Sequence, residues 1–278
     1  MSKEEKRSEN KTIFEEKPLI EHLRELLIRL RRIIIYLISF TAIYFFIGIS
    51  YIEVNGQEIP IPIPDLYNSL SIMLVRYLIT TTVPQGLKLI NIGFMDTIIS
   101  SLYVSIYFGF ITSFPLILRE IWAFIAPGLY EHEKKMLRNL LLPSILLFVL
   151  GSLFAYYIIV PLMLKFLYYY TIAFQVEPTL SIRSFIGTII SLMIGTGIAF
   201  QLPLFMIILT MIGLVKSQTW RKYWRYGIFA GWLIAWIISP GTTGGLVESM
   251  IALTLNSLYL SGIYFSRYVE KRRNKNKK

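Results

Sequence analysis

The chain has 278 residues, of which 55% are hydrophobic and 16% charged, and its formal net charge is +11. Its apolar residues form uninterrupted blocks of membrane-spanning length, and they do not alternate at period two, which excludes a soluble globular domain and a β-barrel. The chain has no cysteine, which excludes disulfides, thiol nucleophiles and thiolate metal sites. Composition therefore predicts an all-α polytopic membrane protein.

The charge distribution along the chain divides it into three parts. We expect a charged cytoplasmic tail over residues 1–17, a compact transmembrane domain over 18–267 and a basic cytoplasmic tail over 268–278. Six spans are predicted in the middle part, the last two of them short, within a few residues of these bounds: Ile33–Ile52, Thr97–Leu118, Leu140–Pro161, Phe185–Leu214, Tyr226–Ser239 and Leu246–Phe265.

Just before the first span, Pro18–Arg32 carries leucines at helical spacing. This pattern predicts an amphipathic helix that lies at the membrane interface and runs into the first span. Glu21 and Glu25 share one face of that helix. Glu25 can pair with Arg29 at the i, i+4 spacing, so its carboxylate either belongs to a solvated ion pair or binds a partner molecule.

Six spans place both termini on one side of the membrane. Lys and Arg number 24 on that side and 4 on the other, so the positive-inside rule predicts cytoplasmic termini. The positive charge is thus a topology signal, with contact to anionic lipid as a secondary interpretation, and nucleic-acid binding explains it less well.

Prolines punctuate the predicted spans and are expected to kink them. Each proline removes a backbone donor, and kinked helices favour a concave arrangement over a straight bundle. Such prolines are Pro115, Pro143, Pro161 and Pro203.

The segment between the second and third spans, Phe114–Lys135, is a polar hinge that carries Glu120, Glu131 and Glu133. Acids at the end of a span lie where a membrane protein presents a surface to a partner. Alternatively, Glu131 and Glu133 only neutralise neighbouring basic residues.

Gln201 is the most conspicuous polar residue well inside a span, two positions before Pro203. An amide at that depth is unfavourable unless it is paired. It either bonds internally, for example to a carbonyl that Pro203 leaves free, or meets a polar group of a partner helix.

Several sequence motifs resemble the TatC family, the core receptor subunit of the twin-arginine protein translocase, across about Pro18–Arg267. The amino-terminal pattern is His22-Leu23-Arg24-Glu25-Leu26, and the loop signature is Trp122-Ala123-Phe124-Ile125-Ala126-Pro127-Gly128-Leu129-Tyr130-Glu131-His132-Glu133. The third and fourth spans add Phe154-Ala155-Tyr156 and Phe200-Gln201-Leu202-Pro203.

The resemblance implies a receptor that binds twin-arginine signal peptides at the cytoplasmic face of the cell membrane. It implies an oligomeric complex with small single-span TatA- or TatB-like partners that exports folded proteins, driven by the proton-motive force. The implied signal-peptide contacts are Glu25 and Glu133, with Phe124 and Pro127 shaping the loop. Arginine suits this chemistry because its planar fork makes paired bonds to a carboxylate that lysine cannot reproduce.

The resemblance also implies an outer cap shaped by Pro64. The family commonly has glutamate where this chain has Gln201, so an ionised group is missing there, while Gln201 and Pro203 can still dock a partner helix. We therefore expect Pro64 to belong to the outer cap, and Gln201 and Pro203 to belong to the partner interface.

The alternative function is a small-molecule secondary transporter or channel, which would predict carboxylates in mid-membrane or two related halves, and neither is visible. The hypothesis that the chain is an enzyme has even less support, since no nucleophile–base pair or phosphate-binding loop is visible in the sequence. With two histidines and no thiols, no metal site is expected, and no cofactor is implied.

Overall fold

The computed structural model describes residues 3–54, 57–125, 138–241 and 243–275. Their helices, in chain order, are α1 (Lys3–Phe46), α2 (Leu70–Thr82), α3 (Asp96–Ile125), α5 (Leu141–Phe154), the π-helical turn η2 (Ala155–Ile159), α6 (Val160–Ala173), α7 (Ile182–Ala199), α8 (Leu202–Ile212), α9 (Ser217–Lys222), α10 (Trp224–Ile238) and α11 (Leu246–Lys275). The strands are β1 (Ile47–Val54), β2 (Gln57–Pro64), β3 (Lys88–Ile90) and β4 (Thr179–Ser181).

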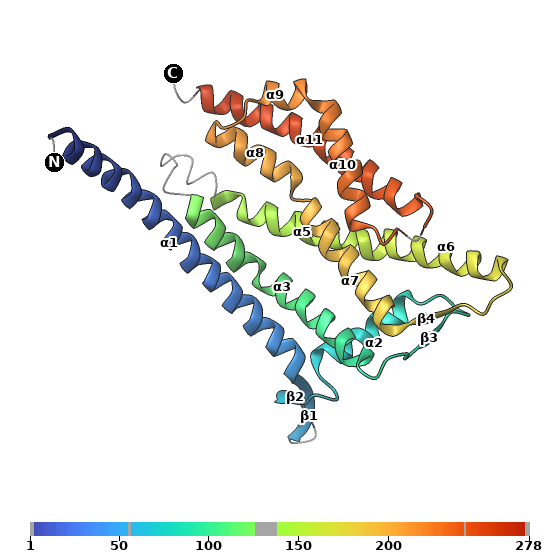
Figure 1. The fold of residues 1–278 in the computed structure, drawn as a ribbon. Helices are drawn as coiled ribbons and strands as arrows, with labels where there is room; N and C mark the ends of the chain where they lie inside the picture. Colours follow the sequence, from blue (N-terminus) through green and yellow to red (C-terminus); the bar gives the residue numbers. More distant parts are fainter. Residues whose placement is uncertain (1–2, 55–56, 126–137, 242, 276–278) are drawn as a thin grey trace.

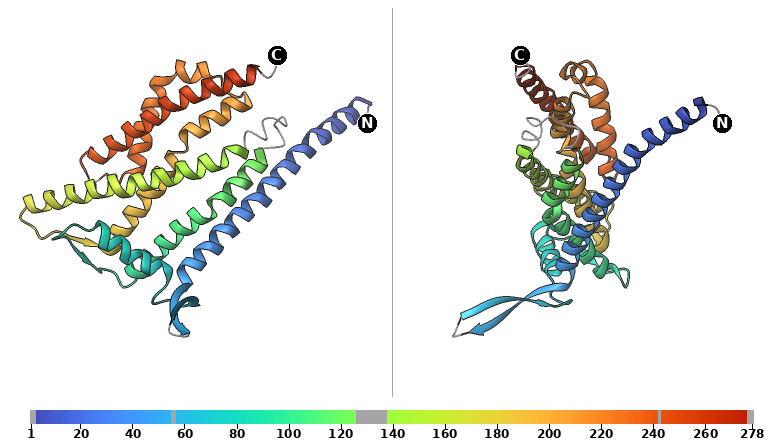
Figure 2. Two further views of the ribbon diagram at one scale, coloured as in Figure 1. Left: turned by 180° about the vertical axis from the view of Figure 1, so that it is seen from behind. Right: turned by 90° about the vertical axis from the view of Figure 1, so that its left-hand side faces the viewer.

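The helices form a fan rather than a closed bundle (Figures 1 and 2). α1 and α3 run side by side along one margin, α10 and α11 lie at the other, and the long α5–η2–α6 helix and the α7–α8 pair lie between them. Both termini lie at one end of the fan, and the β1–β2 hairpin projects from the opposite end. This arrangement agrees with the all-α, concave fold expected from the sequence.

Four stretches of helix in the described part of the chain are long and apolar enough to cross a membrane. They are Asp96–Phe124, Leu141–Ala173, Ile182–Ile212 and Leu246–Lys271, and Trp224–Ile238 is a shorter apolar helix. With the apolar end of α1, they account for the six predicted spans.

Some boundaries differ from the predicted ones. The first span was expected to reach Ile52, but α1 ends at Phe46 and the chain turns into β1. Of the last two helices, both expected to be short, α10 has 15 residues and α11 has 30, because α11 continues beyond its apolar part. α1 also begins at Lys3, so the expected amino-terminal tail and amphipathic helix are continuous with the first span.

The helical backbone is irregular next to two of the prolines. The π-helical turn Ala155–Ile159 directly precedes Pro161, where a widened turn accommodates a proline that cannot donate a backbone hydrogen bond. The chain breaks between α7 and α8 at Phe200 and Gln201, and Pro203 lies in the first turn of α8, where its missing donor is harmless. Pro115, in contrast, lies inside the uninterrupted α3.

The end of the fan opposite the termini contains strands that were not predicted from the sequence. β1 and β2 pair antiparallel, with Pro64 opposite Ile47, and β3 pairs parallel with β4. Pro64 thus lies where the hairpin returns to the end of α1, next to the hydrogen bond that the Asp65 amide donates to the Phe46 carbonyl at 3.0 Å.

The buried core joins α3, α6, α7 and α11 around η2. Its fully buried side chains include Val104, Ile159, Phe185, Ile189 and Ile251. This contact holds the middle of the fan together, while α1 packs chiefly on α3.

Candidate functional site

A cluster of charged side chains joins α1 to the last two turns of α3, two helices that run side by side (Figure 1). Arg29 of α1 donates to Glu25 Oε1 from Nε at 2.9 Å and from Nη2 at 2.6 Å. Its remaining nitrogen, Nη1, donates to Glu120 Oε2 of α3 at 3.2 Å. Arg32 Nη1 lies 3.6 Å from the same Glu120 oxygen. One guanidinium therefore bridges two carboxylates from different helices.

The four side chains differ in burial. The Glu120 side chain retains 8% of its accessible surface and Arg29 20%, whereas Glu25 retains 35% and Arg32 55%. The inner part of the cluster is shielded from solvent, which strengthens its charge interactions relative to exposed pairs. Glu25 is the carboxylate that a molecule arriving from solvent reaches first.

An open groove lies over this cluster on α1. It has a volume of about 280 Å³ and is lined by Glu21, Arg24, Glu25, Ile28, Arg29 and Arg32. Two carboxylates, three guanidinium groups and one isoleucine line the groove, so it offers acceptors for a cationic group of a ligand.

An aromatic contact fixes the neighbouring turn of α1 against α3. The His22 ring stacks on the Phe124 ring, with centroids 4.5 Å apart and planes at 21°. Phe124 was expected in a loop that starts after Leu118, but α3 continues to Ile125, so both Glu120 and Phe124 are helical. Phe124 is thus a packing residue of α3, one turn beyond Glu120.

The structure therefore brings together two of the predicted signal-contact residues, Glu25 and Phe124, on neighbouring helices. Glu133 and Pro127 lie outside the described residues. The i, i+4 pair of Glu25 and Arg29 expected from the sequence is confirmed. Sequence reasoning singled out Glu120 as an acid but not its pairing with Arg29 and Arg32, because the residues are far apart in the chain and meet only through the packing of α1 on α3.

Gln201 has an internal partner. Its Oε1 accepts a hydrogen bond from Ser144 Oγ at 2.7 Å, and its Nε2 donates to the Ser144 carbonyl at 2.9 Å. Both polar groups of the amide are thus satisfied by α5. The partner is Ser144 rather than a carbonyl left free by Pro203, and docking of a partner helix at Gln201 stays a prediction.

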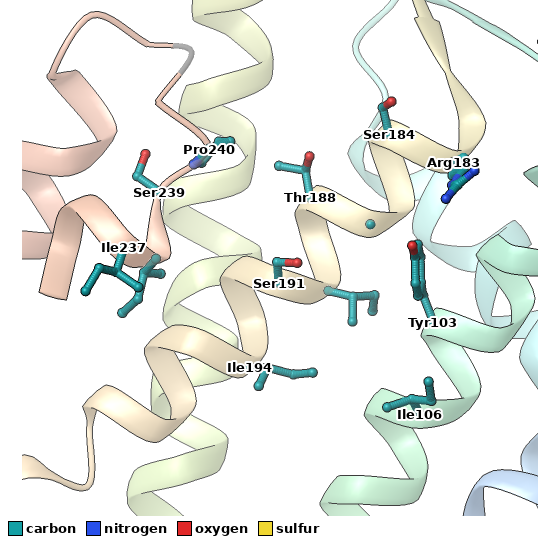
Figure 3. Close-up of a pocket in the computed structure, with 13 residues that line it drawn as sticks. Tyr103, Ile106, Arg183, Ser184, Thr188, Ser191, Ile194, Ile237, Ser239 and Pro240 are labelled. Atoms are coloured by element: carbon teal, nitrogen blue, oxygen red, sulfur yellow. The ribbon is translucent and has the colours of Figure 1, made fainter.

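A larger cavity, of about 640 Å³, lies between α3, α7 and the end of α10 (Figure 3). Ser184, Thr188 and Ser191 of α7 face it, with Tyr103 on the opposite wall. The charged residue in its lining is Arg183, whose Nη1 lies 3.8 Å from Asp96 Oδ1. The lining is mostly hydroxyl groups and carbon, so it is distinct in chemistry from the charged groove on α1.

The fan of apolar helices defines a multi-pass helical membrane protein with a charged site between α1 and α3. The family model of the Sec-independent protein translocase protein (TatC) matches residues 21–255. The chain therefore belongs to the TatC family. Members of this family are components of a protein translocase, and it is not a family of enzymes.

Relatives and solved structures agree with this assignment. The chain is 31% identical over 259 residues to the Sec-independent protein translocase protein TatC of Aquifex aeolicus, covering 92% of this chain and 97% of that protein. It is 29% identical over 260 residues to TatC of Escherichia coli strain K12, with 93% and 92% covered. A crystal structure of the twin arginine translocase receptor TatC is similar with a TM-score of 0.70 and 31% identity, and the match covers 89% of this chain and 99% of that one.

Proposed function

We propose that the chain is the receptor subunit of a twin-arginine translocase and that it binds the paired arginines of signal peptides at the groove on α1. The observation that carries the proposal is the cluster itself, in which Glu25 and Glu120 already hold a guanidinium at 2.6 Å and 3.2 Å. A site that binds its own arginine in this way has the geometry to bind an arginine from a ligand. Glu133 is expected to contribute a further carboxylate.

The orientation in the membrane follows from charge. Both termini, and the groove on α1, belong to the side that carries 24 of the 28 Lys and Arg residues, which the positive-inside rule assigns to the cytoplasm. Signal peptides are made in the cytoplasm, so this sidedness gives them direct access to the groove.

The remaining parts of the proposal concern assembly and energy. We expect single-span TatA- or TatB-like partners in an oligomeric complex, with transport of folded proteins driven by the proton-motive force. A partner helix that docks at Gln201 and Pro203 would either replace the two hydrogen bonds to Ser144 or pack against the Gln201 amide while those bonds stay in place. Membership of a translocase family favours this function over the alternative of a small-molecule transporter.

The test is a binding titration with a twin-arginine signal peptide and its twin-lysine counterpart, on the purified protein in mild detergent. Glu25→Gln and Glu133→Gln should each weaken binding of the twin-arginine peptide by about 1–3 kcal/mol, because each removes a charge-assisted acceptor. Glu131→Gln, two residues before Glu133 in the chain, is the matched control and should change binding less.

Two outcomes would contradict the proposal. One is equal affinity of the unmodified protein for the two peptides. The other is unchanged binding of the twin-arginine peptide by the Glu25→Gln, Glu133→Gln double variant.

A further inference from the structure

Two carboxylates at the groove, Glu25 in its lining and Glu120 on the neighbouring helix α3, are already bonded to the chain's own Arg29. All three guanidinium nitrogens of Arg29 donate to carboxylate oxygens, two bonds reaching Glu25 and one reaching Glu120. Arg32 approaches Glu120 from the next turn of α1. The cluster thus contains two carboxylates and two arginines, so its formal charges cancel.

Occupation by Arg29 constrains any arginine that arrives from outside. Both bonds from Arg29 fall on Glu25 Oε1, so a ligand arginine that makes the two-bond fork contact with both oxygens of this carboxylate must compete with Arg29 for Oε1. Removing one partner of a shielded pair without replacement is strongly unfavourable, whereas exchanging one guanidinium for another leaves no carboxylate unpaired. Exchange is therefore the favourable route to this site.

Position and exposure allow such an exchange. Arg29 borders the open groove, and its Glu25 partner retains 35% of its side-chain surface, so ligand and resident arginines can reach the same carboxylate from solvent. Glu120 retains only 8% and stays fixed beneath the groove. It can hold Arg29 before exchange and accept from the ligand afterwards.

We propose that Arg29 is an internal competitor that occupies the signal-peptide site, and that a signal peptide binds by displacing Arg29 from Glu25 and Glu120. The inference rests on the proposed function and adds to it Glu120 as a further ligand-binding carboxylate. It also gives a source of selectivity: lysine has no planar fork and cannot replace three guanidinium bonds, so a lysine pair displaces Arg29 poorly. The net affinity is the difference between two similar arginine contacts, which makes binding reversible.

The experiment is a titration of labelled twin-arginine and twin-lysine peptides on the full chain in mild detergent. Arg29→Gln removes the competitor and should tighten binding of the twin-arginine peptide by about 3- to 10-fold, because a ligand arginine then meets unoccupied carboxylates. Arg31→Gln is the matched control, since Arg31 is an exposed arginine of the same helix that does not line the groove, and it reports the effect of losing one positive charge alone.

A second pair of variants separates competition from a structural role. Arg29→Lys keeps the charge and loses the fork, so it should also tighten binding, by less than Arg29→Gln, and it serves the same purpose if Arg29→Gln does not fold. Adding Glu120→Gln to Arg29→Gln should abolish the gain, because Glu120 accepts from the ligand once Arg29 is gone.

The outcomes are distinguishable. If the unmodified protein prefers the twin-arginine peptide but Arg29→Gln and Arg29→Lys bind it no better than Arg31→Gln, Arg29 is a structural or contributing group and the inference is wrong. If Glu120→Gln leaves the gain of Arg29→Gln intact, the role of Glu120 is wrong. Equal binding of both peptides by the unmodified protein contradicts the proposed function, and the inference falls with it.

Discussion

At the scale of single residues, the two polar side chains that attract attention in the sequence have different environments. Glu25 lies at the edge of an open groove with a third of its side chain exposed. Gln201 has both groups of its amide bonded to Ser144. The first is accessible to a ligand from solvent, and the second joins two helices of the same chain.

The bond between Gln201 and Ser144 predicts a stability effect. Gln201→Leu removes two interhelical hydrogen bonds, and such bonds in membranes contribute roughly 0.6–2 kcal/mol each. We expect the free energy of unfolding to fall by about 1–4 kcal/mol for the two bonds together, as measured by reversible denaturation in detergent. Ser144→Ala, which removes the hydroxyl but keeps the carbonyl acceptor, should give a smaller loss.

Gln201→Glu serves as a further control, since its side chain still accepts from the Ser144 hydroxyl and should be milder than leucine. If Gln201→Leu leaves stability unchanged and instead reduces co-purification of a single-span partner, the docking prediction is supported and the internal role is not.

Residue-level prediction from the sequence succeeded where the partners are local. The pairing of Glu25 with Arg29 follows from their spacing on one helix. The link from Arg29 to Glu120 does not, because it depends on how α1 packs against α3. For the same reason, the sequence left open whether the Gln201 amide is satisfied within the chain.

At the scale of elements, glycines set the distance between α5 and α7. A Cβ at Gly151 would lie 2.7 Å from the Thr196 carbonyl oxygen and 2.9 Å from the Gly197 Cα. These are backbone atoms, which cannot rotate away. The contact also brings the Thr196 hydroxyl within 3.0 Å of the Gly151 carbonyl, to which it donates.

Gly151→Ala should therefore destabilise the protein by about 1–3 kcal/mol, because the added methyl group overpacks two helix backbones. The measurement is the midpoint of thermal or denaturant unfolding in detergent. Gly187→Ala is the matched control, since its Cβ would meet only the Tyr103 ring at 3.2 Å, and alanine also favours the helix. Equal stability of the two variants would show that the α5–α7 contact relaxes and does not depend on Gly151.

Prediction of whole elements was accurate where hydrophobicity alone decides. The long spans are visible because an uninterrupted apolar run of sufficient length has few alternatives to a membrane helix. The β1–β2 hairpin was missed because Ile47–Ile52 was assigned to the first span by its apolar character alone, and α2 was missed because it lies in the connection expected between the first two spans. The alternation of Pro60, Pro62 and Pro64 with isoleucine in β2 was an available signal, since proline is excluded from a helix interior and is tolerated along the free edge of a strand.

At the scale of the whole molecule, both termini lie at one end of the fan and the hairpin lies at the other. The charged groove is lined by residues of α1 that precede its apolar end, on the side of α1 away from the hairpin. The basic residues lie overwhelmingly on the side of the termini. The proposed receptor role requires that this end faces the compartment in which signal peptides are made. Site and orientation can therefore be tested together.

The most direct measurement is photocrosslinking of a twin-arginine peptide that carries a photoreactive residue next to its arginines, added to sealed inside-out and right-side-out vesicles. We predict adducts in inside-out vesicles only, mapped by mass spectrometry to residues 21–32 of α1 and to the end of α3 near Glu120, and displaced by unlabelled twin-arginine peptide but not by its twin-lysine counterpart. Adducts confined to α10 and α11, or obtained equally from right-side-out vesicles, would contradict the account.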